Sequence, residues 1–173
     1  MDAEEAGSPH PTLLDVILRD ATAADDAALA SFDPGSGTRW LDEVVEIVDG
    51  LIAWRDDPSE RAFDRRVVVA ENDGQIVAVA AHERLEHERA GVLSAHRYRM
   101  VVAVREDRQR TGLAQMITEA VIAEMQSEGV QSVRWLVHPG NAPSIAFSRS
   151  VFPNADESSP PEDDPYICFV LGL

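Results

Sequence analysis

The sequence has no lysine and only one cysteine, Cys168, among its 173 residues. A single cysteine excludes an internal disulfide, and few cysteines are typical of proteins from reducing compartments. No apolar run approaches the about 20 residues that a membrane-spanning helix needs. The acidic opening MDAEEAGSPHP lacks the positive charge and the apolar stretch of a secretion signal. We therefore expect a cytoplasmic protein.

Positive charge is scarce as well. The 31 acidic residues outnumber the 15 arginines and give a net charge of −16 at pH 7. Such a field repels nucleic acid and anionic membrane surfaces, so we expect neither as a partner, and it attracts cationic substrates. The length suits one domain. We expect residues 1–13, which are acidic and contain proline, to be a disordered tail, and residues 14–173 to be a single domain.

Hydrophobic periodicity predicts an alternation of strands and helices. Strands are expected at 13–20, 66–72, 75–82, 98–104, 132–137 and 166–171, and helices at 23–32, 39–55, 113–128 and directly after Asn141. Asn72-Asp73-Gly74 predicts a tight hairpin between antiparallel strands. The strands on either side of the helix at 113–128 should be parallel because a helical crossover joins them. The residues from 154 to 165 are expected to form an acidic loop. The fold class is therefore α+β, with helices on a mixed sheet.

A strand, an arginine-rich loop and a helix follow one another between residues 101 and 114. The first N–H groups of a helix have no partner inside it, and the helix dipole favours an anion there. Gly112 has no Cβ to obstruct such an anion. Arg105, Arg108 and Arg110 add local positive charge to an acidic protein. This helix start is predicted to bind a phosphate-bearing ligand.

Two common phosphate-binding motifs do not fit this segment. A P-loop ends in Gly-Lys-Ser/Thr, and the chain has no lysine. A dinucleotide fingerprint requires three spaced glycines after a strand, and only Gly112 is present here.

Gln109, Gly112 and Ala114 match the pattern Gln/Arg-x-x-Gly-x-Gly/Ala, and the sequence here resembles the GNAT superfamily of N-acetyltransferases. A second segment, Asn141-Ala-Pro-Ser-Ile-Ala-Phe, resembles the family's Asn-x-x-Ala-x-x-Phe motif. The resemblance covers about residues 14–173. It implies a GNAT-like mixed, mostly antiparallel sheet with a parallel, splayed central strand pair and helices on both faces.

The resemblance implies acetyl-CoA as the cofactor. The backbone of Val102, Ala103 and Val104 should pair with the pantetheine arm like an added strand, and Asn141 should lie near that arm. The amides of one hexapeptide should hold the pyrophosphate: Gln109, Arg110, Thr111, Gly112, Leu113 and Ala114. The residues alone also allow a plainer interpretation, in which the two valines are core residues and Asn141 is a helix cap.

Transfer of an acetyl group to an amine requires removal of a proton, because a free alkylamine has a pKa of about 10.4. In the family, a tyrosine directly after the second motif often reprotonates the leaving thiolate, and this position is Ser148 here. Three candidate catalytic residues follow. They are Ser148 as a proton relay through water, Tyr98 as a polar group facing the substrate, and His138 as a base. Tyr98 is otherwise an ordinary strand tyrosine, and His138 a polar residue at a strand end.

The predicted function is direct transfer of an acetyl group from acetyl-CoA to a primary amine. The alternative, which Ser148 leaves open, is a non-catalytic acyl-CoA-binding module of the same fold. The acceptor would be a small-molecule or protein amine, cationic ones included, and a homodimer is common in the family. No metal is expected, because the spacing of His82 and His87 places them on different faces of a helix or strand.

Overall fold

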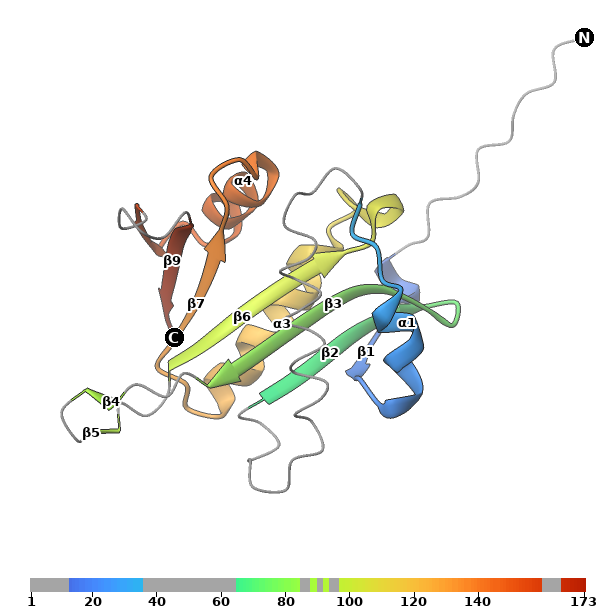
Figure 1. Cartoon of the computed structure of the whole chain (residues 1–173), viewed down its shortest axis with the longest axis horizontal. Coiled ribbons are helices and arrows are strands. Elements are labelled where there is room, and N and C mark those ends of the chain that lie inside the picture. The colour runs from blue at the N-terminus through green and yellow to red at the C-terminus, as the bar shows by residue number, and fades with distance from the viewer. Residues whose placement is uncertain (1–12, 36–64, 85–87, 90–91, 94–96, 160–165) are drawn as a thin grey trace, which may run out of the picture.

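The computed structural model describes residues 13–35, 65–84, 88–89, 92–93, 97–159 and 166–173. Seven strands form one sheet in the order β1-β2-β3-β6-β7-β9-β8 (Figure 1). Their bounds are β1 Ile17–Asp20, β2 Arg65–Asn72, β3 Gln75–Arg84, β6 Arg97–Val104, β7 Ser132–Val137, β8 Asp156–Ser158 and β9 Ile167–Gly172. Two short strands, β4 (Glu88–Arg89) and β5 (Val92–Leu93), pair separately. The described α-helices are α1 (Asp26–Ala30), α3 (Leu113–Ser127) and α4 (Ala142–Val151).

The pairing confirms the predicted fold class. β6 and β7 are parallel, and every other pair in the described sheet is antiparallel. The connection between β6 and β7 runs through α3, as the helical periodicity predicts. The hairpin between β2 and β3 turns at Asp73 and Gly74, both of which have positive φ. This conformation is the reason that an Asn-Asp-Gly sequence favours the turn.

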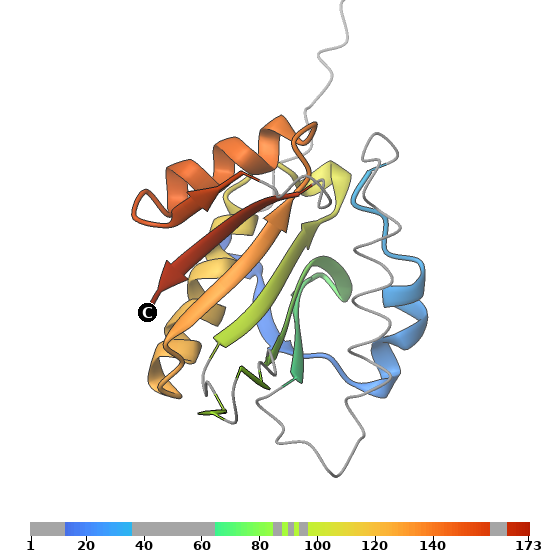
Figure 2. The same cartoon turned by 60° about the vertical axis from the view of Figure 1, so that its left-hand side comes forward.

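The sheet separates two apolar layers. One face carries α3 and the larger core cluster, which contains Ile117, Val121 and Met125 from the helix. Residues of even number on β6 and of odd number on β7 face this cluster, as in Met100 and Val133. The other face packs against α1 through a smaller cluster that includes Leu29 and Val101 (Figure 2). Because side chains alternate along a strand, each residue of β6 and β7 is thereby assigned to one face.

Five elements differ from the prediction. The expected strand at 13–20 begins with a 3-10 turn at Leu13–Asp15. The expected helix at 23–32 is a 3-10 turn followed by only five α-helical residues. The acidic stretch contains β8, whose three residues are all exposed, so no hydrophobic alternation marks the strand. The short strands β4 and β5 lie in a polar stretch for which no strand is predicted. The predicted helix at 39–55 and residues 1–12 of the predicted tail lie outside the described residues.

The 3-10 turn that precedes α1 is held by contacts of Asp25. The carboxylate of Asp25 accepts hydrogen bonds from the guanidinium of Arg19, at 2.8 Å for each oxygen, and from the backbone N–H of Thr22 at 2.7 Å. Hydrogen bonding to Arg19 holds the pKa of Asp25 well below its usual range. Asp25 therefore anchors the first turn to β1.

Candidate functional site at the opening between β6 and β7

The two parallel strands pair over only part of their length. Their register ends at the pair Arg99↔Arg134, although β6 continues to Val104 and β7 to Val137. Beyond this point the strands diverge, and α4 follows the end of β7 (Figure 1). The β7-facing edge of residues 100–104 therefore borders a V-shaped opening. An unpaired strand edge of this kind can bind an extended segment through its backbone. The register confirms the splayed central pair that the family resemblance implies.

The loop at the end of β6 leads directly into α3. The N–H of Arg105 donates to the carbonyl of Val77 at 3.0 Å, and a 3-10 turn covers Glu106–Arg108. The first helical hydrogen bond runs from Met116 to the carbonyl of Gly112, at 3.0 Å. The N–H groups that precede it at Leu113 and Ala114 belong to the first helical turn and have no partner within the helix.

The backbone just before α3 has an unusual conformation. Gly112 has a φ of 88° and Arg110 a φ of 62°, both in the left-handed region. A non-glycine residue in this region is strained by about 1 to 3 kcal/mol, and such residues gather at ligand-binding turns. Within the described ranges, the N–H groups of Arg110, Thr111 and Gly112 have no hydrogen-bond acceptor. Together with the first turn of α3, they form a row of donors suited to an anion.

The three loop arginines differ in what they contact, which changes the predicted picture of a shared positive cluster. The guanidinium of Arg105 binds the carboxylate of Asp107 through two hydrogen bonds of 2.6 and 2.9 Å. This contact holds the pKa of Asp107 below its usual range and gives Arg105 a counter-charge. Arg110 is exposed and forms no ion pair with another described residue. Of the three side chains, Arg110 has the charge most available to a phosphate.

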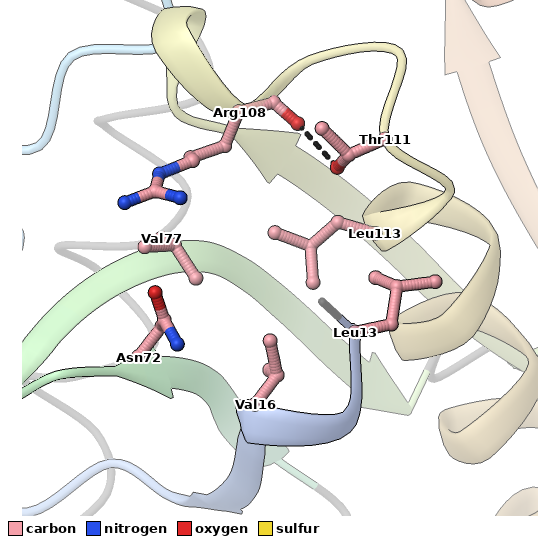
Figure 3. A pocket seen from close by; sticks show the side chains of 7 residues that line it. All are labelled: Leu13, Val16, Asn72, Val77, Arg108, Thr111 and Leu113. Carbon is pink, nitrogen blue, oxygen red and sulfur yellow. Dashed lines mark hydrogen bonds between the residues drawn. The ribbon is translucent and has the colours of Figure 1, made fainter. Parts of the chain in front are cut away.

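Arg108 and Asn72 line a small pocket beside β2 and β3 (Figure 3). The Nε atom of Arg108 lies 3.6 Å from Oδ2 of Asp107 in an ion pair, and it is buried without a hydrogen-bond partner, as is Oδ1 of Asn72. The backbone carbonyl of Arg108 accepts a hydrogen bond from the Thr111 hydroxyl at 2.7 Å, which closes the turn. The hydrogen bond between Arg108 and Thr111 therefore stabilises the turn that precedes α3.

Gln109 ties the loop to a distant segment. Its side-chain amide donates to the carbonyl of Pro34 at 2.7 Å and to that of Val104 at 3.2 Å. Pro34 follows α1, so this contact joins residues that lie 75 positions apart in the sequence. The backbone N–H of Gln109 donates to the carbonyl of Glu106 at 3.3 Å, so the glutamine of the hexapeptide has a structural role in the loop.

Asn141 caps α4 at the far side of the opening. Its Oδ1 accepts a hydrogen bond from the backbone N–H of Ser144 at 3.2 Å. The capping role that the sequence allows is therefore present.

The structure places Tyr98 within the core. Its side chain is 3% exposed and belongs to the cluster on the α3 face. Its ring meets that of His82 edge to face, with centroids 5.6 Å apart. The opposite face of β6 carries Arg99 and Val101. The plainer interpretation of Tyr98, an ordinary strand tyrosine, therefore fits its position better than contact with a substrate.

Ser148 is also buried, at 2% exposure. Its hydroxyl oxygen accepts a hydrogen bond from Nε1 of Trp135 at 2.8 Å. The Trp135 indole is stacked on Phe169 and meets Phe152 edge to face. A serine fits here because the indole fills the space beside α4, and the serine hydroxyl satisfies the indole N–H. Its depth makes Ser148 a poor proton relay to the opening.

His138, the third candidate, lies at the end of β7. Its Nδ1 accepts a hydrogen bond from the N–H of Gly140 at 3.0 Å, and its ring meets Tyr166 edge to face. An Nδ1 that accepts a hydrogen bond leaves the ring proton on Nε2. The remaining nitrogen of the neutral ring is then a donor, which disfavours the role of base.

Residues 27–151 match the model of the acetyltransferase (GNAT) family. This match covers more than half of the chain, and the protein belongs to this family. No curated protein sequence matches the chain. No helix in the described ranges is long and apolar enough to cross a membrane.

Several solved structures share the fold. The ribosomal-protein-S18-alanine N-acetyltransferase from Escherichia coli is 17% identical, with a TM-score of 0.63 over 91% of this chain and 92% of that chain. The PaiA N-acetyltransferase from Thermoplasma acidophilum, in complex with coenzyme A, is 11% identical, with a TM-score of 0.69 over 91% and 99%. YncA from Salmonella typhimurium, with its cofactor acetyl-CoA, is 19% identical, with a TM-score of 0.65 over 91% and 92%. At these low identities, the similarity to the solved structures establishes the fold alone.

Proposed function

We propose that the protein is an acetyl-CoA-dependent N-acetyltransferase whose acceptor is a primary amine. The observation that carries the proposal is the union of two features on one strand. β6 has an unpaired edge along the opening, and it ends in a loop whose free N–H groups face no described acceptor. The family membership and the ligands bound to PaiA and YncA support this assignment.

The loop before α3 and the open edge of β6 fit the pyrophosphate and the pantetheine arm of coenzyme A. Backbone amides from Arg110 to Ala114, with the guanidinium of Arg110, would hold the pyrophosphate at the start of α3. The amide of Gln109 already donates to the carbonyl of Glu106 at 3.3 Å. The edge of Val102, Ala103 and Val104 would hold the pantetheine arm, with Asn141 on the opposite side of the opening. When bound, acetyl-CoA would supply a thioester: the C–N bond to the amine would form as the C–S bond breaks, and the amine proton would end on the leaving sulfur, directly or through water.

The protein contributes position and charge to this reaction. The loop fixes one end of the cofactor and the strand edge aligns the rest, which brings two reactants into one geometry. The backbone N–H groups along the open edge of β6 are the donors available to a developing negative charge. The net charge of −16 raises the local concentration of a protonated amine.

The alternative function is a non-catalytic acyl-CoA-binding module. The hydrogen bond between Trp135 and Ser148 favours this alternative, since it places a buried structural serine where the family often has an acidic tyrosine. Both functions require the cofactor, and only the enzyme releases free thiol in the presence of an amine.

Two measurements test the proposal. Thermal unfolding should shift upward with acetyl-CoA, because a ligand at a hundred times its Kd adds about 2.7 kcal/mol of stability. Free-thiol release should then depend on both acetyl-CoA and an added amine. Binding without amine-dependent thiol release would identify the non-catalytic module. The absence of a thermal shift at millimolar acetyl-CoA would overturn both cofactor-based functions.

A further inference from the structure

A row of three charged side chains crosses the sheet where β6 and β7 separate. The register aligns Glu83 on β3 with Arg99 on β6, and Arg99 with Arg134 on β7. Arg99 and Arg134 form the last pair before the strands diverge. The row therefore lies at the closed end of the opening, which we call the apex.

The row lies on the face opposite α3. Val133 and Trp135, which flank Arg134, face the core cluster under α3, and so do Tyr98 and Met100, which flank Arg99. Alternation along the strands therefore directs both arginines to the α1 side of the sheet. Both arginines are half-buried on that face.

The charges in the row do not balance among the described residues. Arg99 forms an ion pair with Glu83, whose side chain is 12% exposed. Arg134 forms no ion pair with a described residue, and its Nε atom is buried without a hydrogen-bond partner. The Nε of Arg99 is buried and unpartnered as well. A half-buried guanidinium with an unused donor is costly to keep, and such groups call for an explanation.

The apex is too far from the loop to serve the pyrophosphate. Arg105 lies six positions after Arg99, and a strand rises about 3.3 Å per residue, so the two residues lie about 20 Å apart. A pantetheine arm bound along β6 from the loop points toward the apex. The apex is therefore where an acceptor would meet the reactive end of the cofactor.

We propose that Arg134, with Arg99 beside it, binds a carboxylate on the acceptor, so that the acceptor is a small amine that also carries an acidic group. The inference rests on the proposed function. Arginine binds carboxylates through two parallel hydrogen bonds, and an Nε–H is one of the donors it uses. The overall negative charge attracts the ammonium group, and the apex holds the carboxylate. Acceptor selection then depends on both ends of the molecule.

The test compares amines that differ only in the carboxylate. Glycine, β-alanine and γ-aminobutyrate are paired with methylamine, ethylamine and propylamine. One readout is the KM for each amine at saturating acetyl-CoA. The second is the thermal shift that each amine causes in protein saturated with coenzyme A, which needs no turnover. The variants are Arg134→Gln, Arg134→Lys and the control Arg149→Gln, which changes an exposed arginine on α4 that pairs with Glu157.

We expect at least one carboxylate-bearing amine to have a KM lower by about tenfold or more than its partner, and to shift the unfolding temperature further. Arg134→Gln should abolish both preferences and leave the KM for acetyl-CoA unchanged. Arg134→Lys should retain part of them, and Arg149→Gln all of them. Because the side chain of Arg134 forms no hydrogen bond or ion pair with a described residue, Arg134→Gln should not lower the unfolding temperature of the free protein.

The two proposals fail in different ways. Equal KM values for the paired amines, or a preference that survives Arg134→Gln, would overturn the carboxylate site while acetylation still supports the enzyme. If no amine is acetylated but the carboxylate-dependent thermal shift is present and lost in Arg134→Gln, the site stands and the enzymatic function does not. If there is neither turnover nor a carboxylate-dependent thermal shift, the carboxylate site is overturned.

Discussion

The two ends of β6 are built in different ways. At its C-terminal end, consecutive residues place backbone N–H groups at the start of α3, and the main side-chain contribution comes from Arg110. At its N-terminal end, Glu83, Arg99 and Arg134 come from three strands and meet only because the register aligns them. In the proposed function, the backbone at one end binds the cofactor and side chains at the other end select the acceptor. Variants at the two ends should accordingly affect different ligands.

The largest effect should come from the two glycines at opposite ends of α3. Gly112→Ala and Gly129→Ala both place a Cβ on a residue of positive φ, at 88° and 74°, which costs about 1 to 2 kcal/mol of stability. Only Gly112 lies in the anion-binding row, and its new Cβ has space in the free protein. Gly112→Ala should weaken acetyl-CoA binding about 100-fold, or about 2.8 kcal/mol. Isothermal calorimetry on both variants measures this difference.

Gly129→Ala should bind acetyl-CoA as the unmodified protein does. An equal loss in both variants would mean that strain in the helix, rather than access of the anion to the loop, governs binding.

The next effect concerns the buried serine. Ser148→Ala removes the acceptor for Nε1 of Trp135, and an unsatisfied buried donor costs about 2 kcal/mol. We expect the free energy of unfolding to fall by this amount in denaturant titrations, while kcat changes less than about twofold. A large drop in kcat with unchanged stability would instead make Ser148 a catalytic residue.

A smaller effect is expected at β1, away from both ends of β6. Arg19 lowers the pKa of Asp25 in the folded protein, so this contact stabilises the fold at pH values above the unfolded pKa of about 3.9. The stabilisation is lost progressively as the pH falls from that value through the much lower pKa of the folded protein. Asp25→Asn should cost about 1.5 kcal/mol at pH 7 and clearly less at pH 2. Urea unfolding at the two pH values checks this, and an equal cost at both would argue against the ionised contact.

The smallest effect should follow from loosening the loop. Gln109→Ala removes hydrogen bonds to Pro34 and Val104, at a cost of about 1 kcal/mol in stability. Because the backbone amides remain, acetyl-CoA binding should weaken only about threefold. Fluorescence-monitored unfolding and calorimetry give the two values. A loss as large as that of Gly112→Ala would show that the side chain, and not the backbone, organises the site.

Features built from neighbouring residues can be predicted from the sequence, as at the C-terminal end of β6. The long helix shows its apolar face at regular spacing, and the hairpin shows its turn residues, so both are confirmed. The loop before α3 is contiguous, and its glycine marks the backbone conformation that the structure contains. These features depend on neighbours in the chain, which is the information that periodicity and motifs carry.

Contacts between distant residues were not predictable in this way. The stop in the β6–β7 register, the bond from Gln109 to Pro34 and the row at the apex depend on how strands far apart in sequence align. Ser148 shows the same limit. Its position in the motif indicates proton transfer, whereas its burial depends on Trp135 thirteen residues earlier. The sequence places Asp107 two positions after Arg105, but their pairing depends on the 3-10 turn at Glu106–Arg108 and was not predicted.

Hydrogen exchange with and without acetyl-CoA tests the central claim most directly. We predict that the cofactor slows exchange in a peptide covering residues 101–114, which includes the open edge of β6 and the loop. Exchange at residues 132–134, where β7 is already paired, should change little. Slower exchange confined to other parts of the chain, or no change anywhere at saturating acetyl-CoA, would contradict the assignment of the opening between β6 and β7 as the cofactor site.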